Sequence, residues 1–357
     1  MHKTRGNPVN FVVDGLQIRQ DLLNTECAKS AAALDLGDMQ SHVEGLDWGT
    51  DWVGNGFKAV IFKKMSQKAY DFNCPLRPPR QKNRSRWDNY AMTITYKDAE
   101  GIAGMRVAGR LASELLDYLT PFVKPGITTN ELDKLADDYT VNVQHAISAP
   151  LNYAPSGHNP YPKSICTSIN QQVCHGIPND KPLKKGDIVN VDVTVIKDGW
   201  HGDSSRMFMV GEVSVAAKRL CALTYEAMWH GIVKVKDGAY LGDIGHAIQT
   251  FSEGHGLSVV REFCGHGIGQ KFHEDPQILH YGRPGTLSQL KAGMTITIEP
   301  MLNIGRKEIK EMGDGWTIVT KDRSLSAQWE HTVLVTETGY EVLTLSDGGP
   351  AIPSFVK

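Results

Sequence analysis

Residues 187–210 read DIVNVDVTVIKDGWHGDSSRMFMV, and this stretch decides the fold. Between Asp187 and Lys197, valines at every second position alternate with polar residues. This period of two predicts a β-strand with one buried face and one polar face. Lys197-Asp198-Gly199 is typical of a hairpin turn, so we expect a return strand over residues 200–210.

The predicted hairpin brings two acidic residues together. A turn centred near Lys197-Asp198 places Asp192 and Asp203 opposite or nearly opposite each other. Opposed like charges destabilise a strand pair, and carboxylates in a core-facing site are costly to keep ionised. A bound cation removes both objections. A single Asp is usually a solvated surface residue, so the hypothesis depends on the pair.

Two more acids and a histidine extend this pattern. The runs 294–299 and 328–335 alternate like strands and carry Glu299 and Glu330, although acidic residues are depleted in strands. Residues 264–269 read CGHGIG and place His266 among glycines, where backbone can approach a ligand closely. One His with four carboxylates suits two divalent ions such as Mn²⁺, Fe²⁺ or Co²⁺, which together are typical of hydrolysis.

The composition excludes several classes of protein. The chain has 357 residues, of which 41% are hydrophobic and 22% charged, as in ordinary soluble domains. A net charge of −2 gives no basic footprint for nucleic acid. Six cysteines without a C-x-x-C pair favour reduced thiols and a cytoplasmic setting. We find neither a secretory signal nor the roughly 18 apolar residues that would cross a membrane.

The regular pattern begins near Met92. Helices are expected over Ala99–Phe122, after Asp98 or a neighbour as cap, and from a cap at Thr128 or Asn130 through Asp138. Two later helices are expected over residues 216–235 and through 251. VKPGITTNELDKLA (123–136) and VKDGAYLGDIGHAI (235–248) are alike, which indicates an internal duplication of a helix–helix–strand unit within one α/β (α+β) domain.

These motifs resemble the methionine aminopeptidases, specifically the bacterial type I branch. The matching runs include MRVAGRLASELL, YPKSICTSIN, VCHGIPND, residues 186–208, VVREFCGHGIGQKFHEDPQILHY, MTITIEPM and DGWTIVTKDRSLSAQWEHTVLVT, in the family's order. The resemblance implies a pita-bread fold, in which a curved antiparallel sheet flanked by helices has internal pseudo-two-fold symmetry. The short spacing between Glu299 and Glu330 favours type I, because type II has a long insertion there.

The resemblance also implies a site. The metal ligands would be Asp192, Asp203, His266, Glu299 and Glu330, holding two divalent ions (Co, Mn, Fe, Ni or Zn), with Asp203 and Glu330 bridging them. A water activated by the ions would attack the carbonyl after the first residue. Glu299 would be the general base, His273 would steady the charge on the carbonyl oxygen, and His175 would contact the scissile amide nitrogen.

A pocket for the Met side chain carries over in the same way. It would consist of Tyr153, Tyr161, Cys166, Phe272 and Trp316, with His175 at its edge and His273 beside it. An apolar, aromatic slot suits a thioether. The loop between Tyr153 and Tyr161 is longer than in the short bacterial pattern, and Pro150 replaces a Cys that is common there.

The expected function is removal of the initiator Met from nascent proteins whose second residue is small, by a cytoplasmic monomer near the ribosome. No nucleic acid or membrane partner is expected. One alternative is a proline-specific aminopeptidase or prolidase of the same fold, and another is a non-catalytic binding protein. A two-metal phosphatase would need phosphate-clamping cations, and only Arg206 lies near a ligand in sequence.

Residues 92–347 are expected to form the catalytic domain, and 348–357 a C-terminal tail. Residues 1–91 have no counterpart in the resemblance and include a breaker-rich basic run, CPLRPPRQKNRSRW. We expect either a natural start near Met92, with the earlier segment a start-site overcall, or a poorly ordered extension. Cys27 and Cys74 alone cannot build a zinc-binding domain.

Overall fold

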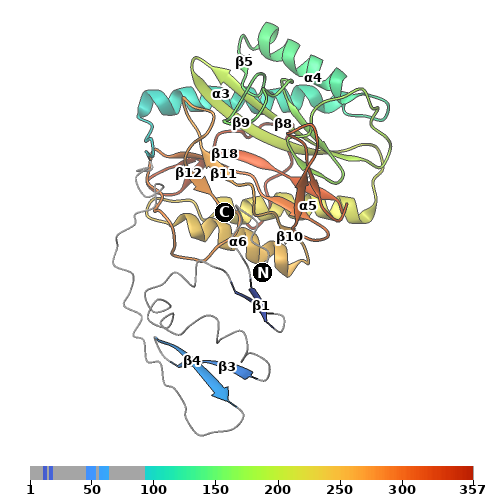
Figure 1. The fold of residues 1–357 in the computed structure, drawn as a ribbon. Helices are drawn as coiled ribbons and strands as arrows, with labels where there is room; N and C mark the ends of the chain where they lie inside the picture. The colour runs from blue at the N-terminus through green and yellow to red at the C-terminus, as the bar shows by residue number, and fades with distance from the viewer. Residues whose placement is uncertain (1–10, 14–15, 19–45, 54–55, 64–92, 357) are drawn as a thin grey trace. The chain divides into compact units, whose positions relative to one another are not determined.

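The computed structural model describes residues 11–13, 16–18, 46–53, 56–63 and 93–356, and the chain divides into two units, Met1–Ala91 and Met92–Lys357 (Figure 1). In the first unit, β1 (Phe11–Val13) pairs with β2 (Leu16–Ile18), and β3 (Leu46–Val53) pairs with β4 (Gly56–Lys63). The predictions for residues 1–91 rest mainly on positions outside the described residues, including Cys27 and Cys74, and stay predictions.

The second unit begins with the predicted long helix. Helix α3 (Ala99–Leu119) is followed by the 3₁₀ turn η2 (Thr120–Phe122), and the Asp98 side chain accepts a hydrogen bond of 2.8 Å from the Gly101 N–H. Asp98 is therefore the cap that the sequence predicted. Helix α5 (Val215–Ile232) matches the later expected helix to within three residues.

The two shorter helices carry the internal repeat. Helix α4 (Thr129–Asp138), which runs on into the π-helical turn η3 (Tyr139–Val143), starts with a capping box at Thr128. Helix α6 (Leu241–Gly254) starts after Tyr240, whose N–H donates a hydrogen bond of 2.9 Å to the Asp243 carboxylate, which is half of the same device. Each cap also forms an isolated bridge to a later segment, Thr128 to Pro182 and Tyr240 to Gln289. The similar sequence runs thus adopt the same local structure, as the predicted duplication requires.

The predicted hairpin is present, with a different register. Strand β8 (Ile188–Lys197) pairs with β9 (Trp200–Met209) around Asp198-Gly199, whose φ angles are 50° and 84°. A two-residue hairpin of this type needs positive φ at both positions, which Asp and Gly tolerate. The turn therefore centres one residue later than expected. Asp203 pairs with Thr194, so Asp192 and Asp203 are diagonal neighbours on one face rather than directly opposed.

Within the described residues of this unit, the main sheet is nine-stranded and antiparallel, in the order β12-β11-β13-β18-β9-β8-β5, with β19 on β18 and β6 on β8. The remaining strands of this sheet are β5 (Ile147–Ser148), β6 (Cys166–Ile169), β11 (Gly265–Gly267), β12 (Glu274–Ile278), β13 (Thr295–Ile298), β18 (Glu330–Val335) and β19 (Tyr340–Val342). Two three-stranded sheets consist of β10 (Ser258–Val259), β14 (Met301–Asn303) and β17 (Ser326–Gln328), and of β15 (Ile309–Glu311), β16 (Ile318–Thr320) and β7 (Gln172–Cys174).

Two apolar clusters hold the helices against the strands. The β8 valines pack with buried leucines of α3 and α4, while α5 and α6 pack with β13 and β18. Figure 1 shows α3 and α4 on one side of these strands and α5 and α6 on the other. Because side chains alternate along a strand, Asn190, Asp192 and Thr194 face away from α3. The helices therefore leave one face of the hairpin free for polar chemistry.

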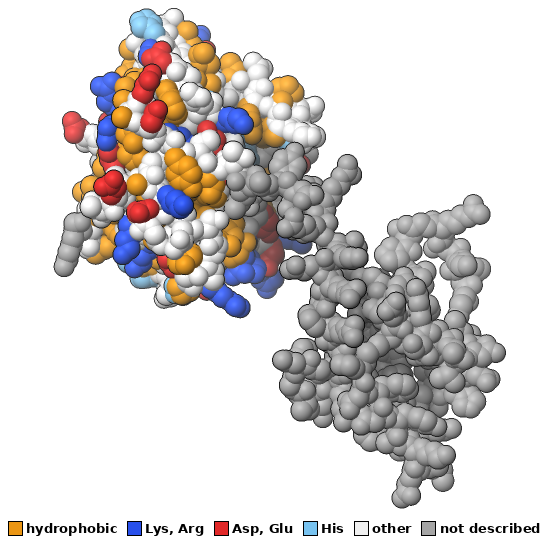
Figure 2. Space-filling model, turned by 90° about the vertical axis from the view of Figure 1, so that its left-hand side faces the viewer, with side chains coloured by type: hydrophobic (Ala, Val, Ile, Leu, Met, Phe, Trp, Pro, Cys, Tyr) orange, Lys and Arg blue, Asp and Glu red, His pale blue; other side chains and the backbone are white. Residues whose placement is uncertain are grey.

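Residues 348–356 pack against α5. The Tyr225 hydroxyl donates a hydrogen bond of 3.1 Å to the Pro350 carbonyl, and the Phe355 ring stacks on His230 with centroids 4.3 Å apart. On the face shown in Figure 2, acidic and basic side chains of the described residues are interspersed rather than gathered into one basic patch. No helix among the described residues combines the length and apolarity needed to cross a membrane.

Candidate metal centre

Asp203 is held from two sides on the polar face of the hairpin. Its carboxylate accepts a hydrogen bond of 2.8 Å from the Thr194 hydroxyl. Its backbone carbonyl accepts one of 2.7 Å from the Thr332 hydroxyl of β18, which also lies 3.2 Å from the Asp203 N–H. With 3% of its surface exposed, Asp203 is a buried acid in a fixed position.

Glu299 and Glu330 lie where a strand pair passes from one sheet to another. Strands β13 and β14 belong to different sheets, and only Glu299 and Pro300 separate them. The ladder ends at this point because proline has no N–H to donate. Their partners β18 and β17 are interrupted at Trp329, so that Ile298 pairs with His331 and Met301 with Gln328. The prediction that Glu299 lies inside a strand was therefore wrong by one residue, because the ladder breaks there.

The glycines around His266 serve strand packing. A Cβ on Gly265 would lie 2.3 Å from the Thr297 carbonyl oxygen, and one on Gly267 would lie 2.3 Å from that of Asp275. The close approach that these glycines allow is to the backbone of neighbouring strands. His266 Nδ1 lies 2.9 Å from the Gly267 carbonyl oxygen. A carbonyl only accepts, so Nδ1 carries the proton and Nε2 offers a lone pair.

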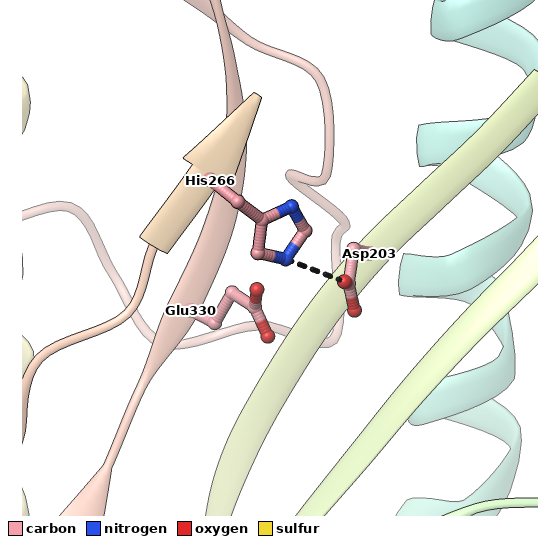
Figure 3. Close-up of side chains that lie close together, drawn as sticks. All are labelled: Asp203, His266 and Glu330. Carbon is pink, nitrogen blue, oxygen red and sulfur yellow. Dashed lines mark ion pairs between the residues drawn. The ribbon is translucent and has the colours of Figure 1, made fainter. Parts of the chain in front are cut away.

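These side chains converge on one point. The ligand atoms of Asp203, His266 and Glu330 all lie within 4.8 Å of one another, from β9, β11 and β18 (Figure 3). His266 Nε2 is 3.7 Å from Asp203 Oδ2 and also 3.7 Å from Glu299 Oε1. Such gaps are too long for hydrogen bonds, but they fit donor atoms that each contact an ion at about 2 Å.

The charges of the site are unbalanced without a metal ion. Burial raises the pKa of Asp203, Glu299 and Glu330 well above the usual range, and repulsion among the acids adds to this. Burial also raises the pKa of Asp192 to about 7 and lowers that of His266 to about 4. Among the described residues, no Lys or Arg pairs with these four carboxyls. Two buried and two half-buried carboxyls beside a neutral imidazole are a donor set that fits divalent cations.

An aromatic cluster lies next to this centre. Tyr161, Cys166 and Trp316 are buried together with the half-buried Tyr153, and the Tyr161 ring meets Trp316 edge-on with centroids 5.1 Å apart. Cys166 is paired with Asp192 across β6 and β8. The Tyr161 hydroxyl donates to the Gly176 carbonyl at 3.0 Å, so it contributes its ring as an apolar wall.

His273 and Phe272 connect the cluster to the centre. The Tyr153 hydroxyl lies 3.0 Å from His273 Nδ1, the Tyr153 and Phe272 rings are 5.1 Å apart, and the His273 ring is 4.2 Å from that of His266. Desolvation by the surrounding side chains, together with the nearby imidazoles of His266, His175 and His201, lowers the pKa of His273 to about 3, so this imidazole is neutral at pH 7.

His175 completes the set on the side of Trp316, whose ring centroid is 6.2 Å away. Burial lowers its pKa to about 4. Its φ of 55° lies in the left-handed region, which is uncommon outside glycine and clusters at functional sites. The structure thus brings all the predicted ligand, catalytic and pocket residues into one neighbourhood.

Two histidines near the site escaped the sequence analysis. His201 lies two residues before Asp203; its Nδ1 is 2.9 Å from the Gly269 carbonyl oxygen, and its ring stacks on Phe272 at 5.9 Å. Its spacing to Asp203, which puts both on one strand face, was the available signal. His280 is fully buried, and its Nε2 accepts a hydrogen bond of 3.1 Å from the Glu299 N–H. No local pattern reveals that contact, because it joins the ends of two strands.

Arg206 does not form a phosphate clamp. Its guanidinium pairs with Asp117 at 2.9 Å and donates to the Ser346 hydroxyl at 3.2 Å. These contacts tie Arg206 to α3 and to the C-terminal segment, which is a structural role. The phosphatase alternative therefore has no support among the described residues.

Comparison with known proteins defines the class. Residues 103–337 match metallopeptidase family M24, and the chain belongs to that family. Its fold is the pita-bread fold that the resemblance implied: a curved antiparallel sheet with helices. The prolidase from Pyrococcus furiosus has the same fold, with a TM-score of 0.54 at 21% identity.

The branch within the family follows from higher similarities. The methionine aminopeptidase of Escherichia coli (strain K12) is 58% identical over 266 residues, which are 74% of this chain and 99% of that protein. The crystal structure of methionine aminopeptidase from Rickettsia prowazekii has a TM-score of 0.68 at 55% identity, covering 71% of this chain and all of that one. That from Thermotoga maritima has a TM-score of 0.67 at 38% identity and the same coverage of this chain. The proteins that resemble this chain at 38–58% identity are thus methionine aminopeptidases.

Proposed function

We propose that this metallo-aminopeptidase removes the N-terminal Met from polypeptides whose second residue is small. The observation that carries the proposal is the convergence of Asp203, His266 and Glu330 within 4.8 Å, beside a cluster of aromatic side chains and Cys166. High identity to methionine aminopeptidases supports it.

Asp192, Asp203, His266, Glu299 and Glu330 would hold two divalent ions. Carboxylates and one imidazole suit Co, Mn, Fe, Ni or Zn. Bound ions of this kind acidify a water and polarise a carbonyl. The proposal assigns the chain's own groups to the remaining tasks.

Glu299, itself one of the proposed ligands, takes the proton of the attacking water; its Oε1 lies 3.7 Å from His266 Nε2 and accepts a hydrogen bond of 3.0 Å from the Thr297 hydroxyl. His273 acts on the carbonyl oxygen. When the Tyr153 hydroxyl donates to Nδ1, Nε2 carries the proton and can donate to the developing negative charge. His175, neutral and next to Trp316, contacts the amide nitrogen that leaves.

The aromatic cluster receives the Met side chain. Tyr153, Tyr161, Phe272 and Trp316 offer ring faces and edges, and a thioether makes favourable contacts with aromatic rings. The free α-amino group would be recognised near the metal ligands, so that the first peptide bond is the one that is cleaved. Residues 92–347 constitute the catalytic domain of this proposal. The natural substrates are nascent chains near the ribosome, cleaved in the cytoplasm by a monomer.

The proposal is tested on peptides with metal-reconstituted protein. We expect cleavage of Met-Gly and Met-Ala peptides and loss of at least about 10²-fold in kcat for Glu299→Ala, because a positioned base contributes that much. Faster cleavage of an Ala-Pro peptide would favour the prolidase alternative. Equal activity of Glu299→Ala and the unaltered protein would remove Glu299 from the mechanism.

A further inference from the structure

A buried ion pair lies beside the loop 268–273, which joins β11 to β12 and carries Phe272 and His273. Lys97 Nζ is 2.7 Å from Glu274 Oε2, and the two side chains are only 4% and 6% exposed. Lys97 also donates to the Thr95 hydroxyl at 2.6 Å, and that hydroxyl donates to the same carboxylate. The pair is thus enclosed and hydrogen-bonded, whereas most ion pairs of a protein surface are solvated.

The carboxylate of this pair closes the loop that carries two site residues. Glu274 follows directly after Phe272 and His273, and its Oε1 accepts a hydrogen bond of 3.2 Å from the Lys271 N–H. A Cβ on Gly269 would lie 2.6 Å from that same oxygen and 2.7 Å from Lys97 Cε. The loop is therefore folded tightly around Glu274, and a Cβ at Gly269 would displace the Glu274 carboxylate or the end of the Lys97 side chain.

The lysine of the pair is fixed to a rigid part of the domain. The Lys97 N–H donates to the Gly293 carbonyl at 2.7 Å, and the next residue, Asp98, caps α3. Lys97 therefore has little freedom to follow the loop. The loop must instead take the position that the lysine defines.

We infer that Lys97 and Glu274 are positioning residues that hold His273 and Phe272 against the metal centre. The inference rests on the proposed function, which places His273 at the scissile carbonyl. A buried ion pair is a weak source of stability compared with apolar residues of similar volume. We expect the pair to act by fixing the position of His273. A shift of about 1 Å in a catalytic group is enough to slow a reaction about 10²-fold.

The test is a double-mutant cycle on kcat with Met-Gly peptides. Glu274→Gln should lower kcat about 10- to 100-fold, and KM should change less. In a His273→Ala background the same substitution should change kcat by less than about 2-fold, because the group it positions is gone. Additive effects of the two substitutions would overturn the inference. The control is Glu341→Gln, which breaks the exposed 2.7 Å pair between Arg106 of α3 and Glu341 and should leave kcat unchanged.

If Glu274→Gln does not fold, a second variant can test the same inference. Lys97→Met with Glu274→Leu keeps the volume and removes both charges, so it should fold yet retain the loss in kcat. Wild-type kcat in that variant would also overturn the inference. In the metal-free protein, the imidazole NMR signals of His273 should shift in Glu274→Gln and not in Glu341→Gln; unmoved signals would contradict a positioning role. Full activity of His273→Ala would instead refute the proposed role of His273, which separates the two failures.

Discussion

The second unit, Met92–Lys357, has one half with helices α3 and α4 and another with α5 and α6. The two halves hold their proposed metal ligands in different ways. The first half presents Asp192 and Asp203 on a continuous hairpin of two ten-residue strands with a two-residue turn. The second half presents Glu299 and Glu330 where β13 and β18 give way to β14 and β17. Equivalent helix pairs thus support one regular and one interrupted pair of strands.

The interrupted half needs extra contacts to hold its ligands. The Glu299 N–H lies outside the strand ladder and donates a hydrogen bond to His280 Nε2. The Glu299 carboxylate accepts hydrogen bonds from the Thr297 hydroxyl at 3.0 Å and from the Gln328 amide at 3.1 Å. In the hairpin, the ladder itself positions Asp192. Register alone thus places Asp192, whereas Glu299 depends on side-chain partners.

The largest expected effect comes from removing a ligand of either half. Asp203→Asn and Glu330→Gln should each lower kcat/KM by on the order of 10³-fold, because metal ions contribute several kcal/mol to the transition state. Both should also weaken Mn²⁺ binding measured by calorimetry. An effect confined to one half would show that the halves do not share a site.

The second effect concerns pH and the metal-free protein. Burial raises the pKa of Asp192 to about 7 and raises the pKa of Asp203 above its usual range. A raised folded-state pKa gives stability below the unfolded value near 4 that is lost as pH rises through the folded value. With chelator present, the free energy of unfolding should therefore fall between about pH 4 and 7. Added Mn²⁺ should reverse the fall; a chelated protein whose stability increases over this range would contradict the electrostatic account.

A smaller effect on metal affinity is expected from replacing His280, which accepts a hydrogen bond from the Glu299 N–H. His280→Leu leaves the Glu299 N–H without an acceptor and should weaken metal binding about 10- to 100-fold, as is usual for residues that orient ligands. His280→Gln retains an acceptor oxygen and should bind metal more tightly than His280→Leu. Equal affinities of the two variants would mean that the hydrogen bond at 3.1 Å is not what positions Glu299.

The smallest effects compare glycines of the two halves. Gly267→Ala forces a Cβ within 2.3 Å of the Asp275 carbonyl oxygen and should cost about 1–3 kcal/mol of stability. Gly199→Ala places a Cβ in open space but at a φ of 84°, and should cost about 1 kcal/mol. Urea unfolding measures both. A larger loss at Gly199 would contradict the view that strand crowding is the stronger constraint.

Much of the fold was predictable because it is encoded locally. Alternating valines predicted β8, and Asp98 marked the start of α3 through a single side-chain cap. The hairpin register was not predictable from polarity alone. A centre at Lys197-Asp198 or at Asp198-Gly199 puts Asp192 and Asp203 on the same face, and only the backbone conformation distinguishes the two.

The site was predictable where the chemistry itself is unusual. Acidic residues in strand patterns and a His between glycines stand out because such residues are rare there. His280 and Glu274 did not stand out, since a buried His or a Glu at the start of a strand is ordinary until its partner is known. Those partners, the Glu299 N–H and Lys97, are 19 and 177 positions away and are brought close only by folding.

The most direct test of the account is the anomalous scattering of a crystal soaked with Mn²⁺. The account predicts two strong peaks close together, in contact with carboxylate oxygens from both halves and with His266 Nε2. Peaks bound by only one half, or an absence of peaks between Asp203 and Glu330 at saturating Mn²⁺, would contradict it.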